Sequence, residues 1–126
     1  MATSGRFWVA TEAEMLRKAI RDHDKLLLIL STDSIKSEWV KREIVEGLKR
    51  EVKEHRQVVF PIRITSQEKV DNWRCIDESG KDLAAVIREY YIHDFSRWKE
   101  YEEYKIASRR LLKGLRGESA DAAAGT

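Results

Sequence analysis

Several residue types are scarce in this chain of 126 residues, and each shortage excludes a class of protein. A single cysteine, Cys75, cannot build a disulfide framework, which suits a reducing compartment. The glycines are scattered, so the chain has no Gly-rich phosphate loop. No apolar run approaches the roughly 20 residues that span a bilayer, and the N-terminus lacks a basic-then-apolar signal pattern. We therefore expect a cytoplasmic protein without a membrane partner.

An excess of charge of one sign is also absent. The 24 basic residues nearly balance the 22 acidic ones, which leaves a formal net charge of +2. Even the most basic-looking stretch, "KREIVEGLKREVKEHR", carries glutamates that almost match its lysines and arginines. A solvated helix face explains this stretch better than a DNA-binding surface, so no nucleic acid is expected as a partner.

The sequence offers little evidence for a metal site or for a phosphoryl-transfer site. His23, His55 and His93 are far apart and have no cysteines at ligand spacing, so we expect no metal site. Asp33 and Asp94 lie where a phospho-receiver domain keeps acids at strand ends. That fold also needs an acidic pair on its first strand, which this sequence does not offer.

Helical and strand-like segments alternate along the chain. Strands are predicted at residues 25–30, 57–64 and 91–95. Helices are predicted at residues 8–23, from 34 or 37 to 55, at 82–90 and at 98–115. The first of these helices would start earlier if Ser4 caps it. The polar segment 65–81 has Val70, Trp73 and Ile76 as expected anchors, and residues 118–126 form an expected disordered tail. This alternation predicts a parallel sheet with helices on both faces.

The stretch "STDSIKSEWVKRE", residues 31–43, follows the most apolar strand. Ligands bind beyond the carboxyl ends of strands in open parallel sheets, and Trp39 and Glu43 share one helix face. Two interpretations are open. In the structural one, Ser34 or Ser37 caps the helix, Trp39 is buried against the sheet and Glu43 is solvated; in the functional one, these residues line a binding site.

Four stretches in order resemble a bacterial Toll/interleukin-1 receptor (TIR) domain. They are "AIRDHDKLLLILSTDSIKSEWVKREI", with the motif S-x-W-V-x-x-E, then "VVFPIRI", "YYIHDFSRW" and "YEEYKIASRRLLKGLRG". The resemblance covers residues 5 to 117 approximately. It favours the functional interpretation of residues 31–43.

The resemblance implies a substrate and a catalytic residue. In TIR domains that are enzymes, the glutamate of this motif is catalytic in cleaving the nicotinamide–ribose bond of NAD+, and that role would fall on Glu43. Among the substrate-binding residues, Trp39 would pack under the site, while Ser31 and Ser37 would line it or fix the start of the helix. NAD+ would be the substrate, with no further cofactor. A non-catalytic module that binds other TIR domains is the alternative.

The resemblance also implies a difference from a complete TIR domain. Such a domain begins with a strand, a helix, a second strand and a loop, all ahead of the first helix of this chain. We therefore expect a flavodoxin-like α/β fold truncated at its N-terminus, with about three strands and four helices, as a partial TIR domain over residues 1–117. Little NAD+ cleavage by the chain alone, an uncovered edge on strand 25–30 and self-association are expected as well.

Overall fold

The computed structural model describes the backbone of residues 3–117 and the side chains of residues 13–117. The chain divides into two compact units. One contains residues Met1–Lys25 and Arg97–Thr126, and the other contains Leu26–Ser96. The predicted tail, residues 118–126, lies outside the described residues.

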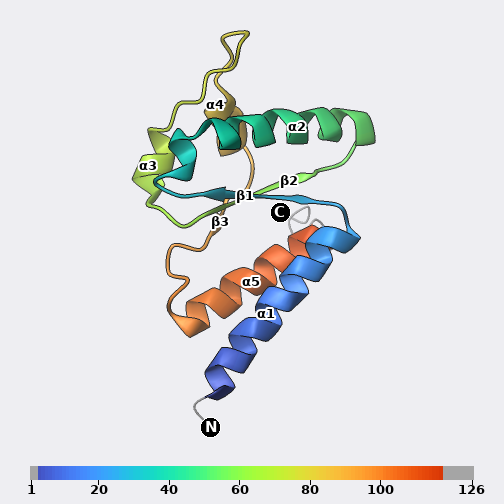
Figure 1. The fold of residues 1–126 in the computed structure, drawn as a ribbon, viewed down its shortest axis with the longest axis vertical. Coiled ribbons are helices and arrows are strands. Elements are labelled where there is room, and N and C mark those ends of the chain that lie inside the picture. Colours follow the sequence, from blue (N-terminus) through green and yellow to red (C-terminus); the bar gives the residue numbers. More distant parts are fainter. Residues whose placement is uncertain (1–2, 118–126) are drawn as a thin grey trace. The chain divides into compact units, whose positions relative to one another are not determined.

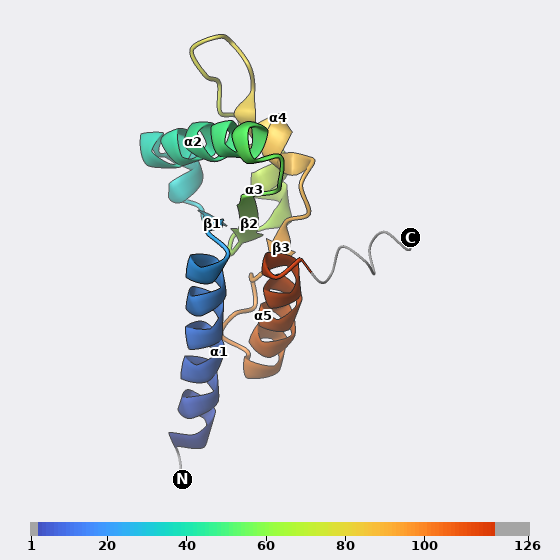
Figure 2. The same ribbon diagram turned by 90° about the vertical axis from the view of Figure 1, so that its right-hand side faces the viewer.

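The first unit is a pair of helices, α1 (Thr3–Asp22) and α5 (Tyr101–Leu115), which lie side by side (Figures 1 and 2). The α1 helix begins at Thr3, ahead of both predicted starts, so Ser4 lies within the helix and does not cap it. One face of α5 is apolar at helical spacing and buried, with Ala107, Leu111, Leu112 and Leu115 on it. This apolar stripe is what holds an otherwise strongly charged helix in place.

The second unit is built on a parallel sheet of three strands, β1 (Leu26–Leu30), β2 (Val59–Arg63) and β3 (His93–Asp94), in the order β1-β2-β3. Leu26 pairs with Val59, Leu30 with Arg63, and Arg63 with Asp94. All three predicted strands are therefore confirmed, each somewhat shorter than expected. Within the described residues, β1 is an edge strand.

Three α-helices, α2 (Glu38–Glu54), α3 (Gln67–Asp71) and α4 (Leu83–Arg88), together with the 3-10 helix η1 (Ser34–Lys36), accompany this sheet. The α2 helix runs along one face of it (Figure 1). A single apolar core joins the sheet to the three α-helices and includes Leu28, Leu30, Val40, Ile44, Val59, Val70, Trp73, Leu83, Ala84 and Ile87. The α/β class and the flavodoxin-like parallel arrangement are thus confirmed.

Three details differ from the sequence prediction. The α3 helix, with Ser66 accepting a hydrogen bond from Lys69 N–H at its start, was not predicted, so the described residues contain five α-helices rather than about four. Val70 and Trp73 are buried anchors as expected, but Ile76 is exposed. Val52 lies four residues after Leu48, at the helical spacing expected of a buried face of α2, but its side chain is exposed.

Candidate functional site

Three serines organise the turn from β1 into α2. The Ser34 hydroxyl donates to the carbonyl of Ile29 at 2.7 Å and accepts from the Ser31 amide at 2.7 Å, while the Ser31 hydroxyl accepts from the Ser34 amide at 2.9 Å. The Ser37 hydroxyl accepts from the Val40 amide at 3.2 Å and so caps α2. Ser31 and Ser37 therefore fix the turn and the start of the helix, which is the structural role expected of them.

Trp39 is not buried, which corrects the prediction. Its side chain is 65% exposed, whereas the next residue, Val40, is 3% exposed and packs on the sheet. A helix turns by about 100° per residue, so Trp39 points sideways from the face that Val40 and Ile44 bury. Since β1 is the edge strand of the described sheet, no strand lies under Trp39.

A groove lies between this side of α2 and β1. It has a volume of about 250 Å³ and is lined by Leu26, Trp39, Arg42, Glu43, Glu46, Gly47 and Arg50. Gly47 brings the helix close to the sheet, since a Cβ on it would lie 2.4 Å from Cγ2 of Val59 and 3.0 Å from Cδ2 of Leu26. The floor of the groove is therefore formed where α2 meets the start of β1.

Glu43 and Trp39 line the same groove, as their spacing of four residues predicts. Glu43 is partly buried, and its carboxylate has no hydrogen bond or ion pair to any of the described residues. The positive charges beside it belong to Arg42 and Arg50. Two carboxylates (Glu43 and Glu46), an exposed aromatic ring and two guanidinium groups thus share one open surface.

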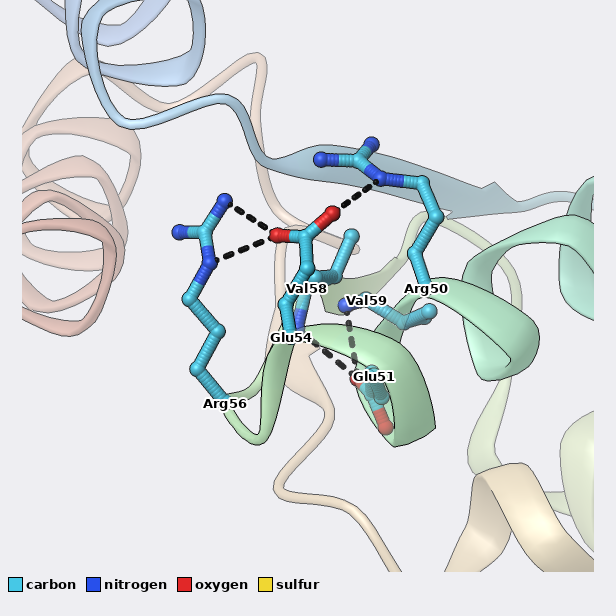
Figure 3. Close-up of polar contacts among 6 residues, drawn as sticks. All are labelled: Arg50, Glu51, Glu54, Arg56, Val58 and Val59. Carbon is cyan, nitrogen blue, oxygen red and sulfur yellow. Dashed lines mark hydrogen bonds and ion pairs between the residues drawn. The ribbon is translucent and has the colours of Figure 1, made fainter.

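The far end of the groove is fixed by an ion-pair cluster (Figure 3). The Glu54 carboxylate binds Nε of Arg50 at 3.1 Å and Nε of Arg56 at 2.8 Å. These hydrogen bonds, from Arg50 and then from Arg56, hold the pKa of Glu54 below its usual value. The Arg50 side chain is thereby directed along α2.

Glu51, one residue further along α2, connects three elements. Its carboxylate accepts from the amides of Val58 and Val59 at 2.9 and 2.8 Å, and from the hydroxyl of Tyr90 after α4. Burial, and then the hydrogen bond to Glu51, raise the pKa of Tyr90 well above its usual value. The cavity of about 610 Å³ beside Glu51 and Tyr90 opens at the opposite end of α2 from the predicted site. The role of Glu51 is structural, and sequence reasoning missed it because its partners are 7, 8 and 39 residues away.

At the carboxyl end of the sheet, polar side chains bind one another across strands. The hydroxyls of Thr32 and Thr65 are 2.9 Å apart, and the Arg63 guanidinium is 3.1 Å from the Asp94 carboxylate. Asp94 also accepts from the amide and the hydroxyl of Ser96. These contacts link the chain at the ends of β1, β2 and β3.

The remaining candidate residues form no site. Among the described side chains, those of residues 13–117, no group of three or more His, Cys, Asp or Glu is placed to hold a metal ion. Burial raises the pKa of the Cys75 thiol, which makes it a poorer nucleophile. No helix in the part of the chain that the structure describes is long and apolar enough to cross a bilayer.

Comparisons with known proteins indicate the family of this chain. The family model of the TIR domain matches residues 10–111, which include all three strands, Trp39 and Glu43. Neither the comparison with curated proteins nor that with solved structures gave a match. Because the family match covers most of the chain, this protein belongs to the TIR domain family.

Proposed function

We propose that the groove beside α2 is part of an NAD+-cleaving site in which Glu43 is the catalytic carboxylate. TIR-domain proteins serve signalling or defence, and this proposal assigns a chemical activity to that role. The observation that supports it is the shared position of Glu43 and Trp39 in one groove, with no described residue bound to the Glu43 carboxylate.

The chemistry suits a fixed anion. When the bond between nicotinamide and ribose breaks, nicotinamide leaves with the bonding electron pair, and positive charge develops on the ribose ring. A carboxylate held beside the ring stabilises this charge in the transition state more than in the substrate. Water then adds to the ribose carbon and loses a proton, which completes hydrolysis.

Other residues of the groove would bind the substrate. The exposed Trp39 indole provides a flat surface on which a nicotinamide or adenine ring can stack. Arg42 supplies positive charge for the pyrophosphate, whereas the Arg50 guanidinium is already paired with Glu54. The groove has a volume of about 250 Å³. Sites that enclose such ligands have volumes of about 300–1,000 Å³, so the groove is smaller than these sites. We therefore expect this surface to hold only part of NAD+, and turnover by the chain alone to be slow.

The alternative function is that of an interaction module. TIR domains generally mediate TIR–TIR interactions. One feature favours this role here: the exposed side chain of Trp39. The two functions make different predictions for Glu43, because only catalysis needs a carboxylate at that position.

The test combines binding and turnover. In NMR titrations with NAD+, the signals of the Trp39 indole N–H and the Gly47 amide should shift, whereas that of the buried Trp73 indole should not. Slow nicotinamide release should be abolished in Glu43→Gln and stay within about two-fold of wild type in Glu38→Gln, which changes an exposed carboxylate of α2 outside the groove. Unchanged groove signals, or equal release by Glu43→Gln and wild type, would refute the proposal and favour the interaction module.

A further inference from the structure

The second half of α5 carries a local excess of positive charge. Residues 104–117 contain five basic residues and no acidic one. The chain as a whole has a net charge of +2, so its other residues together carry a net charge of −3. The near balance of charge over the whole chain therefore conceals a concentration of cations on one helix.

Four of these cations share one side of α5. Successive residues of a helix are turned by about 100°, which places the four within an arc of about 120° and within about 11 Å of helix length. They form a surface that we call the basic face: Arg109, Arg110, Lys113 and Arg116. All four are exposed, whereas the buried residues Ala107, Leu111 and Leu115 lie on the opposite side of the helix.

The basic face lowers the stability of the helix that carries it. Arg109 and Lys113 are four residues apart, a spacing at which like charges destabilise a helix. The helix dipole favours cations in the last turn, but Arg109 and Arg110 precede that turn. None of the four cations has a hydrogen bond or an ion pair to any described residue. A partner that supplies negative charge would relieve this repulsion.

An apolar side chain lies in the middle of the basic face. Ile106 is 43% exposed, and Arg109 and Arg110 follow it by three and four residues, so both cations flank it. The phosphates of a nucleic acid would neutralise the cations and leave Ile106 in water. A surface of anionic phospholipids provides phosphates for the cations and, just beneath them, an apolar layer for Ile106. The combination of groups therefore favours a lipid surface.

We propose that the basic face of α5 is a peripheral docking site for an anionic phospholipid surface. The guanidinium and ammonium groups bind lipid phosphates, while Ile106 enters the boundary between headgroups and acyl chains. The packed side of α5 stays against α1 throughout. Such a contact needs no membrane-spanning segment, and it was from the lack of such a segment that no membrane partner was expected. The proposal does not depend on the proposed NAD+ cleavage.

The test measures co-sedimentation of the chain with sucrose-loaded vesicles. Vesicles of phosphatidylcholine with about one-third phosphatidylserine should bind the wild type at about 0.1 M salt, whereas pure phosphatidylcholine should not. Raising the salt to about 1 M shortens the Debye length from about 10 to about 3 Å and should abolish binding. The variant Arg109→Gln/Lys113→Gln should bind about thirty-fold more weakly, since each cation near the lipid contributes about five-fold.

A matched control removes the same charge elsewhere in the same unit. Arg17 and Arg21 are exposed on α1, on the side away from the buried Ala19, so Arg17→Gln/Arg21→Gln should change vesicle binding by about two-fold at most. Circular dichroism should show unchanged helix content in both double variants. Urea unfolding should show that Arg109→Gln/Lys113→Gln is at least as stable as wild type, because the repulsion is reduced.

A third variant separates a lipid surface from a nucleic acid. Ile106→Ser leaves the charge unchanged and should weaken vesicle binding about five-fold, because less apolar area is buried. Vesicle binding that does not need phosphatidylserine would overturn the proposal, and so would equal losses in the two double variants. Tighter binding to duplex DNA than to vesicles at the same salt, with no effect of Ile106→Ser, would assign the basic face to a nucleic acid instead.

Discussion

At the scale of single residues, two tryptophans of the sheet unit lie in opposite environments. The Trp39 side chain is 65% exposed in the groove, whereas Trp73 is 4% exposed in the core. The carbonyl of Trp73 also accepts from the Arg88 guanidinium at 2.8 Å, which ties the segment after α3 to α4. Tryptophan therefore forms part of an exposed surface at position 39 and part of the core at position 73.

Truncating these two side chains should lower the free energy of unfolding by very different amounts. Trp39→Ala should lower the free energy of unfolding by less than about 1 kcal/mol, because the ring buries little area. Trp73→Ala should lower it by about 3–5 kcal/mol, as the loss of a core aromatic leaves a cavity. Urea unfolding followed by circular dichroism at low protein concentration measures both. A Trp39→Ala variant as unstable as Trp73→Ala would show that the indole is buried in solution.

At the scale of elements, Glu51 joins the end of α2 to the start of β2 and to the segment after α4. Its carboxylate accepts from two backbone amides and from the Tyr90 hydroxyl. The pKa of Tyr90 is raised by burial and by this hydrogen bond. A tyrosine in this situation keeps its proton in the folded chain at a pH at which it loses the proton in the unfolded chain.

This difference predicts a loss of stability at alkaline pH. Above about pH 10 the unfolded chain binds fewer protons at this position than the folded chain, so the free energy of unfolding falls as pH rises. Tyr90→Phe should be less stable than wild type at pH 8 and should show a shallower decline toward pH 11. The neighbouring Tyr91, 64% exposed, provides the control. Urea unfolding across this pH range should show a wild-type slope for Tyr91→Phe, and an equally steep slope for Tyr90→Phe would contradict the assigned contact.

The sequence predicted most elements, and the exceptions have physical reasons. The apolar runs of β1 and β2 are typical of buried parallel strands, and the structure confirms both. The α3 helix escaped prediction because five residues give no periodic pattern. Helical spacing correctly placed Trp39 and Glu43 on one side of α2. It did not reveal what lies beneath that side, because burial depends on where the sheet ends and not on the sequence of the helix.

At the scale of the whole molecule, one groove is assigned two occupants. NAD+ is proposed to bind against Trp39 and Glu43, and a second copy that used the groove as a TIR–TIR contact, as in the alternative function, would cover the same side chains. Both cannot be present at once. By linkage, each occupant must weaken the other by the same factor, so self-pairing would act as a brake on substrate binding.

This competition gives the last prediction. At an NAD+ concentration of about twice its dissociation constant, the unliganded fraction of each copy falls about three-fold, and the apparent dissociation constant of the dimer rises about nine-fold. Glu43→Gln is the suitable protein, compared with and without NAD+ in sedimentation velocity, because it should bind the substrate without consuming it. Sodium chloride at equal ionic strength controls for screening of the Arg42 and Glu46 charges, since it offers neither the pyrophosphate nor the rings that the groove is proposed to bind. If NAD+ shifts the Trp39 indole signal while the dimer persists unchanged, the two occupants do not share the groove, and the interface between copies must lie elsewhere.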